Sequence, residues 1–92
     1  MSKELKHIIT DLMLILEVLK ERQFQDSRKI ELDLQDLMEQ ISRWDNYTNV
    51  KQDELIGLLM NVENYLIKVG VSDIAESLRD IRERLTRLIY NR

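Results

Sequence analysis

Hydrophobic residues recur along this chain at intervals of three and four positions, which is the spacing of one face of an α-helix. Four such segments are separated by polar stretches, and they predict helices over residues 3–22, 27–44, 50–69 and 72–91. The apolar positions that define the segments are Leu5, Ile8, Ile9, Leu12, Leu16 and Leu19 in the first; Ile30, Leu34, Leu37, Ile41 and Trp44 in the second; Leu55, Leu58, Leu59, Val62, Leu66 and Val69 in the third; and Ile74, Leu78, Ile81, Leu85 and Leu88 in the fourth.

The two later breaks have recognisable turn chemistry. Gly70 can adopt the left-handed conformation that ends a helix, after which Val71 can fold back on Leu66. The polar run 45–49 predicts a turn, and Asn49 at its end is the expected N-cap of the next helix. Both boundaries are therefore expected to separate distinct helices.

The break between the first two helices is inferred from polar residues that an uninterrupted helix would bury. The stretch 23–27 contains neither Gly nor Pro, but continuing the first apolar stripe would place Gln23 and Asp26 at core positions. A break there leaves four helices of about 27–30 Å each, at 1.5 Å per residue. Four equal helices with short connections predict an all-α, up-down-up-down four-helix bundle, with residues 1–92 forming one domain. The alternative is a long helical hairpin that dimerises.

Composition supports this fold class and disfavours several functions. The 92 residues include no Pro and only two Gly, which disfavours a β-rich domain. The absence of Cys excludes disulfides, a thiolate nucleophile and cysteine-based zinc sites, and it fits a cytoplasmic protein. The apolar run 12–16 is too short to span a bilayer, so no membrane partner is expected. A net charge of −3 disfavours a general affinity for nucleic acid.

The first and third predicted helices carry apolar residues outside their main stripe. Such a second stripe contacts either a second neighbour within the bundle or another chain. The second and fourth helices, by contrast, have charged backs. We therefore interpret the extra apolar residues as a candidate interface, most simply of a two-fold homodimer or with a different protein partner. These residues are Leu14, Val18, Ile56, Met60 and Ile67.

The segment from residue 79 onward is rich in arginine. One interpretation is a solvated face stabilised by the i,i+4 pairs Asp80–Arg84 and Glu83–Arg87. The other is a contact with an acidic partner or with RNA phosphates. The candidates for that charged contact are Arg79, Arg82 and Arg87.

Residues suited to catalysis are sparse. The only histidine, His7, is placed to pair with Asp11 at i,i+4, and no Ser is placed to complete a catalytic triad. Neither a glycine-rich phosphate loop nor a dinucleotide fingerprint is present. The sequence therefore predicts a protein that is not an enzyme, with no catalytic residue, no cofactor and no metal.

Acidic residues at i,i+3 spacing occur on the second and fourth segments, where facing helices could hold Mg²⁺ through oxygen ligands. The pattern resembles that of MazG-type nucleotide pyrophosphohydrolases, which are small helical bundles, and the resemblance implies a Mg²⁺-dependent hydrolase. The family prefers Glu where the second segment has Asp, so a solvated face is the alternative. The residues are Asp33, Asp36 and Glu39 on the second segment, and Asp73, Glu76, Asp80 and Glu83 on the fourth.

Two further stretches resemble helical-hairpin families. Residues 73–80 are similar to part of the second helix of Rop, a helical-hairpin dimer that binds paired RNA loops, and this implies RNA binding. Trp44, Asp45 and Asn46 lie mid-chain and resemble the Trp-x-Gly turn of hairpin proteins exported by type VII secretion, with Asn46 in place of Gly. The alternative for Trp44 is the last core residue of the second helix.

Together, these patterns favour a non-enzymatic helical interaction module. We expect a small regulator, inhibitor or assembly adaptor that acts through helix faces and forms a homodimer. RNA binding by a Rop-like bundle is the alternative. Nucleotide hydrolysis and a type VII secretion hairpin are weaker hypotheses.

Overall fold

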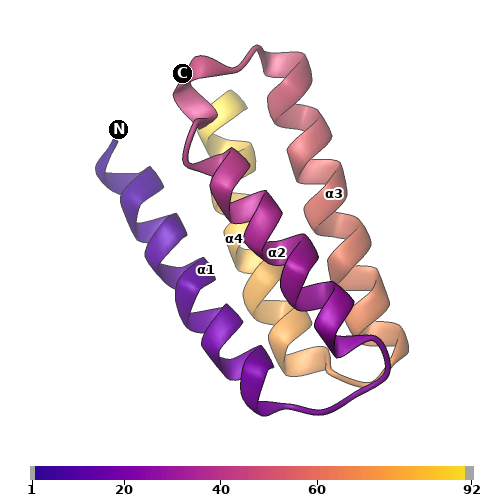
Figure 1. The fold of residues 1–92 in the computed structure, drawn as a ribbon. Coiled ribbons are helices and arrows are strands. Elements are labelled where there is room, and N and C mark those ends of the chain that lie inside the picture. Colours follow the sequence, from indigo (N-terminus) through magenta and orange to yellow (C-terminus); the bar gives the residue numbers. More distant parts are fainter. Residues whose placement is uncertain (1, 91–92) are drawn as a thin grey trace.

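The computed structural model describes residues 2–90 of the chain and contains four α-helices and one short 3₁₀ turn. The elements are α1 (Lys3–Glu21), α2 (Ser27–Ile41), η1 (Trp44–Asn46), α3 (Asn49–Lys68) and α4 (Ser72–Tyr90). In Figure 1 successive helices run in opposite directions. Helices α1 and α3 each pack against both α2 and α4. The predicted all-α, up-down-up-down bundle is confirmed, and the long-hairpin alternative is wrong because α1 and α2 are separate helices.

The first connection has no glycine, yet it contains a left-handed residue. Asp26 has a φ of 60° and precedes the first residue of α2, as an N-cap does. Its carboxylate does not cap the helix, however, but accepts a hydrogen bond of 2.9 Å from the Tyr65 hydroxyl of α3. The Gln25 carbonyl lies 3.0 Å from the same hydroxyl and shares its single proton. A contact from α3 therefore holds this loop in place, which local sequence could not have indicated.

The second helix ends earlier than the apolar pattern predicts. It stops at Ile41, and Trp44 lies instead in the 3₁₀ turn, where its side chain is buried in the core. The next helix begins after Thr48, whose hydroxyl accepts a hydrogen bond of 3.2 Å from the Lys51 amide. Asn49 is therefore the first helical residue, and its prediction as the N-cap is wrong by one position. Extended backbone at Thr48 places that hydroxyl where the free amides lie.

The third connection has the predicted form. Gly70 adopts a φ of 87°, and its amide donates to the Ile67 carbonyl at 3.1 Å. The Val71 amide donates to the Leu66 carbonyl at 2.8 Å, which completes a Schellman motif, and the Val71 side chain is buried. Helix α3 therefore ends at Lys68, one residue before the predicted end at residue 69, and α4 begins at Ser72, as predicted.

The apolar stripes of all four helices meet along the centre of the bundle. Nearly every predicted stripe position is buried, and Ala75 and Ile89 of α4 join them. The main exception is Leu58, which the pattern places in the core but which is 39% exposed. Its exposure marks the seam between α2 and α3, where the groove described below opens. Among residues 2–90, no helix is long and apolar enough to cross a lipid bilayer.

Candidate interaction surfaces

Helix α3 presents an outer face without a charged side chain. We define the α3 outer face as the exposed residues between Leu55 and Ile67, all of which are apolar or neutral. The exposed residues of α2 and α4 include charged side chains along the whole helix, whereas α1 has no exposed charged residue between Lys6 and Glu17. An exposed surface without charge can be buried against another molecule without desolvating an ion. The residues of the α3 outer face are Gly57, Leu58, Met60, Asn61, Asn64 and Ile67.

The only charged residue in this part of α3 points into the bundle. Glu63 is buried, with 6% of its side chain exposed, and it pairs with Arg82 of α4. The Arg82 Nε donates to Glu63 Oε2 at 2.5 Å, and Arg82 Nη2 donates to Oε1 at 3.3 Å. The hydrogen bonds that Arg82 donates to the Glu63 carboxylate raise the pKa of Arg82 above its ordinary value. The ion pair therefore removes the one carboxylate that would have charged the α3 outer face.

Gly57 is the first residue of the α3 outer face, and the packing of this chain does not explain it. A Cβ added there would meet no atom within 4 Å. Glycine inside a helix costs about 1 kcal/mol relative to alanine, so the residue weakens α3 without a compensating contact in the chain. A glycine on an exposed helix face is suited to the close approach of another backbone.

Of the five apolar residues predicted as an interface, two belong to the α3 outer face. Met60 and Ile67 are both exposed. They lie on the side of α3 that adjoins α4, because each is one helical turn from Glu63, which contacts Arg82 of α4. Ile56 lies on the same side but is half-buried against the core. Leu14 and Val18 are exposed on α1, and Leu14 lines another seam of the bundle, between α1 and α4. The structure therefore divides the predicted set between two helices instead of joining it into one surface.

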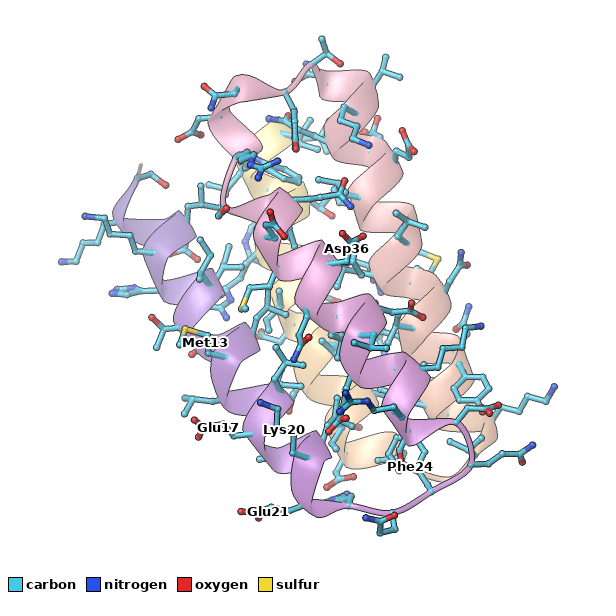
Figure 2. All side chains as sticks on the ribbon, in the orientation of Figure 1. Met13, Glu17, Lys20, Glu21, Phe24 and Asp36 are labelled. Carbon is cyan, nitrogen blue, oxygen red and sulfur yellow. The ribbon has the colours of Figure 1, made fainter. Side chains whose placement is uncertain are left out.

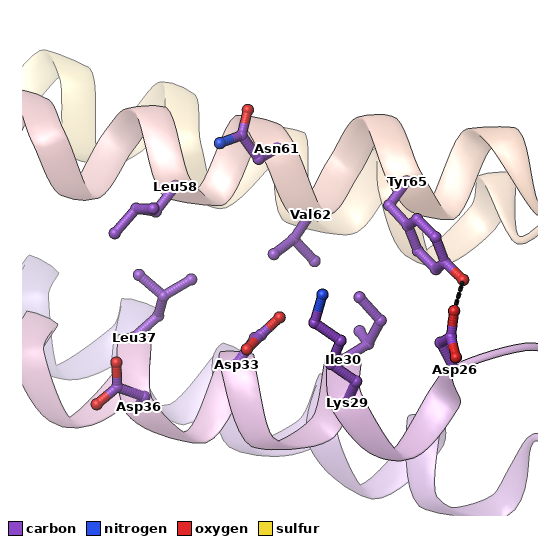
Figure 3. Close-up of a pocket in the computed structure, with 10 residues that line it drawn as sticks. All are labelled: Asp26, Lys29, Ile30, Asp33, Asp36, Leu37, Leu58, Asn61, Val62 and Tyr65. Carbon is purple, nitrogen blue, oxygen red and sulfur yellow. Dashed lines mark hydrogen bonds between the residues drawn. The ribbon is translucent and has the colours of Figure 1, made fainter.

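A groove of about 390 Å³ lies between α2 and α3 (Figure 3). Its floor is apolar, while Asp33, Asp36 and Lys29 lie along the α2 rim. At one end the hydrogen bond between Tyr65 and Asp26 closes the seam. The apolar pattern gave no sign of this groove, because it placed Leu58 in the core. The apolar residues lining the groove are Ile30, Leu37, Leu58 and Val62.

The seam between α1 and α4 is dominated by charge. Arg84 of α4 contacts Asp11 at 2.5 Å, Asp80 at 3.4 Å and Glu4 at 3.8 Å. The predicted Asp80–Arg84 pair is therefore present, whereas Asp11 contacts Arg84, although the spacing suggested a contact with His7. Leu14 lines a shallow depression on this seam together with the carboxylates of α4. An apolar side chain among so many charges is less suited to a dry interface than one on the α3 outer face.

The three arginines predicted to contact a partner have different environments. Arg82 is committed to Glu63, and only 19% of its side chain is exposed. Arg79 pairs with Glu83 at 3.4 Å, which replaces the predicted Glu83–Arg87 pair. Arg87 is exposed. The outer face of α4 is thus mixed in sign, which matches RNA phosphates poorly.

The acidic residues considered for Mg²⁺ do not face each other. Asp33 and Asp36 line the groove between α2 and α3, while Asp73 and Asp80 line the depression between α1 and α4. Within the described part of the chain, no group of three or more potential metal ligands lies close enough to hold an ion. The arrangement that nucleotide hydrolysis would require is therefore not formed by these acids.

Comparison of the chain with models of known protein families, with curated proteins and with solved structures gives no match. The surfaces described above are therefore the basis for a functional proposal.

Proposed function

We propose that this chain is a non-enzymatic helical interaction module that forms a homodimer through the α3 outer face. In this proposal it acts in the cytoplasm as a small regulator, inhibitor or assembly adaptor. The observation that carries the proposal is the uncharged, partly apolar outer face of α3, with its exposed Met60 and Ile67. It extends over about 15 Å of helix, from Gly57 to Ile67.

A neutral face is suited to contact a copy of itself. In a two-fold dimer a residue close to the axis meets its own copy, so a charge there would face the same charge. The α3 outer face has no charge to oppose that contact. Burying its leucine, methionine and isoleucine side chains would remove apolar surface from water at about 25 cal/mol per Å².

The apolar residues of α1 support self-association less well. Leu14 and Val18 are as exposed as the residues of α3, but charged side chains surround them. Figure 2 shows Glu17, Lys20 and Glu21 projecting from the same helix. Two copies of this surface would have to desolvate those charges on contact.

Sedimentation equilibrium of four variants tests the proposal with matched pairs. Met60 and Val18 are 41% and 42% exposed, and Ile67 and Leu14 are 58% and 56% exposed. We expect a dimer for the unmodified chain. Met60→Glu and Ile67→Glu should weaken dimerisation on the order of a hundredfold, because each buries an unpaired carboxylate at the interface. Val18→Glu and Leu14→Glu should leave the mass unchanged.

Circular dichroism of each variant provides the control for folding. All four positions are exposed in the single chain, so each glutamate variant should remain helical. A monomer at every concentration tested would rule out the homodimer. Loss of the dimer in the α1 variants alone would move the interface to the α1 surface.

A further inference from the structure

The charge on the outer side of α3 changes from negative at one end of the helix to positive at the other, with a neutral centre between them. Asp53, Gly57, Asn61 and Asn64 follow one another at intervals of three and four, as does Lys68 beyond them, so they form one line along the helix. The line begins at a carboxylate and ends at an ammonium group. Both end residues are exposed. A second helix lying along this line would therefore meet an acidic end, a neutral centre and a basic end.

From this line we infer that two copies pair through α3 in antiparallel orientation, with the two-fold axis passing between Met60 and Asn61. The inference rests on the proposed homodimer and specifies its geometry. In a parallel pair each residue faces its own copy, so Asp53 would meet Asp53 and Lys68 would meet Lys68. In an antiparallel pair Asp53 meets Lys68 of the second copy, and the two helix dipoles also oppose each other favourably.

The same register gives Gly57 a role. If residue 53 faces residue 68, the midpoint falls between residues 60 and 61, and Gly57 faces Asn64 of the second copy. The missing side chain of Gly57 would then admit the Asn64 amide and let the two helices approach to about 8 Å, the close limit of helix packing. The cost of a glycine inside α3 is offset by a contact that only the dimer makes.

A contact with α4 already holds the acidic end of this line in place within the single chain. The exposed Tyr90 hydroxyl of α4 donates to Asp53 at 3.1 Å, which holds the carboxylate at the acidic end of the line. The hydrogen bond to Asp53 raises the pKa of Tyr90 above its ordinary value. Asp53 is therefore positioned before the second copy arrives, and less side-chain freedom is lost on pairing.

Cysteine cross-linking tests the register directly, because the chain has no cysteine of its own. In the inferred dimer the two copies of residue 61 are offset by about 1.5 Å along the helix, so Asn61→Cys should form an intermolecular disulfide on mild oxidation. The two copies of residue 64 are offset by about 10 Å, beyond the reach of a disulfide, so Asn64→Cys alone should not cross-link. A mixture of Asn64→Cys with Gly57→Cys should form the mixed dimer.

Charge reversal provides a second measurement that does not depend on thiols. Lys68→Glu should weaken dimerisation on the order of tenfold, because it places two like-charged pairs at the rim. Adding Asp53→Lys to the same chain should restore most of the affinity, because the two reversed charges then face each other. In a parallel pair both positions meet their own copies, so Lys68→Glu would exchange one like-charged contact for another, and neither the single nor the double variant would change the affinity.

The possible outcomes separate this inference from the proposed function. If Asn61→Cys cross-links, Asn64→Cys alone does not and Lys68→Glu is rescued, the antiparallel register is supported. If the chain is a dimer that Met60→Glu disrupts, but Asn64→Cys cross-links to itself, the register is wrong and the homodimer stands. If the unmodified chain is monomeric, both are wrong.

Discussion

Helices α3 and α4 pack side by side and have nearly the same length, but their outer faces are opposites. The outer face of α4 carries Glu76, Arg79, Glu83 and Arg87 at helical spacing, whereas the α3 outer face has no charge. Both helices bury an apolar stripe against the same core, with Leu58 of α3 as the exposed exception. The fold depends on those inner stripes, so it does not require this difference between the outer faces. The difference therefore carries information about what each surface contacts.

The contrast extends to the seam between the two helices. The one acid of the central part of α3, Glu63, is neutralised inside the bundle by Arg82 of α4. On α4, by contrast, Arg79 and Glu83 pair with each other in solvent. The same two residue types thus form a buried contact between helices in one place and an exposed contact within a helix in the other. Substitutions at the two pairs should differ greatly in their effect on stability.

The largest effect is expected at the buried pair. Glu63→Ala leaves the Arg82 guanidinium partly buried without its partner, which should lower the free energy of unfolding by roughly 3 kcal/mol or more. The double variant Glu63→Leu with Arg82→Met should recover most of that loss, because it replaces the pair with apolar packing. Urea unfolding of the dilute protein measures both. A loss below about 0.5 kcal/mol for Glu63→Ala would contradict the importance of this pair.

An intermediate effect of opposite sign is expected on the α3 outer face. Gly57→Ala should raise the free energy of unfolding of the monomer by about 1 kcal/mol, because it improves helix propensity at a position with open space. The same change should weaken dimerisation, since a methyl group enters the contact with Asn64 of the second copy. Thermal unfolding at low concentration and sedimentation at high concentration separate the two effects. A variant that stabilises the dimer as much as the monomer would show that no helix approaches Gly57.

A smaller effect is expected on the outer face of α4. Arg79→Ala and Glu83→Ala should each change the free energy of unfolding by no more than about 0.5 kcal/mol, because the pair is exposed and screened by water. A double-mutant cycle measured by urea unfolding gives the energy of the pair itself. A coupling energy as large as that of the buried Glu63–Arg82 pair would contradict the expected difference between exposed and buried ion pairs.

The smallest effect is expected at the N-terminal turn of α4, and it depends on pH. The Arg22 guanidinium contacts the Asp73 carboxylate at 2.6 Å and holds the pKa of Asp73 below its ordinary value. A depressed carboxyl pKa stabilises the folded state above the unfolded pKa of about 3.9, and this contribution disappears as pH falls through the folded pKa. Arg22→Ala should therefore reduce the decline in stability between pH 5 and the acid limit. An unchanged slope of stability against pH would show that the pair adds nothing.

Periodicity predicts most of the fold because burial of an apolar stripe is a local property of each segment. It correctly indicated the four helices, the core and the ending of α3 at Gly70. It could not indicate features set by a neighbouring helix. Leu58 has the spacing of a core residue, but it is exposed because α2 and α3 leave a groove at that point. Trp44 fits the helical stripe of α2, but it is buried from a 3₁₀ turn instead.

The candidate surface was predicted only in part, for a related reason. Met60 and Ile67 were found because they depart from the main stripe of α3. The sequence predicts a surface charge at Arg82, because nothing in the spacing pairs it with Glu63, which lies 19 positions earlier. The neutrality of the α3 outer face becomes apparent only once Glu63 is known to point inward. Sequence spacing gives the direction of a side chain relative to its own helix, but its partner depends on how the helices are arranged.

The burial of Trp44 in the turn between α2 and α3 gives the protein a built-in optical reporter. It is the only tryptophan in the chain, and the Gln52 amide ties its carbonyl to α3 at 2.8 Å. An indole in an apolar setting emits at shorter wavelength than one in water, so its fluorescence should follow the opening of this end of the molecule. Because the indole faces the interior and not the α3 outer face, its emission should respond to unfolding and stay constant when two copies associate.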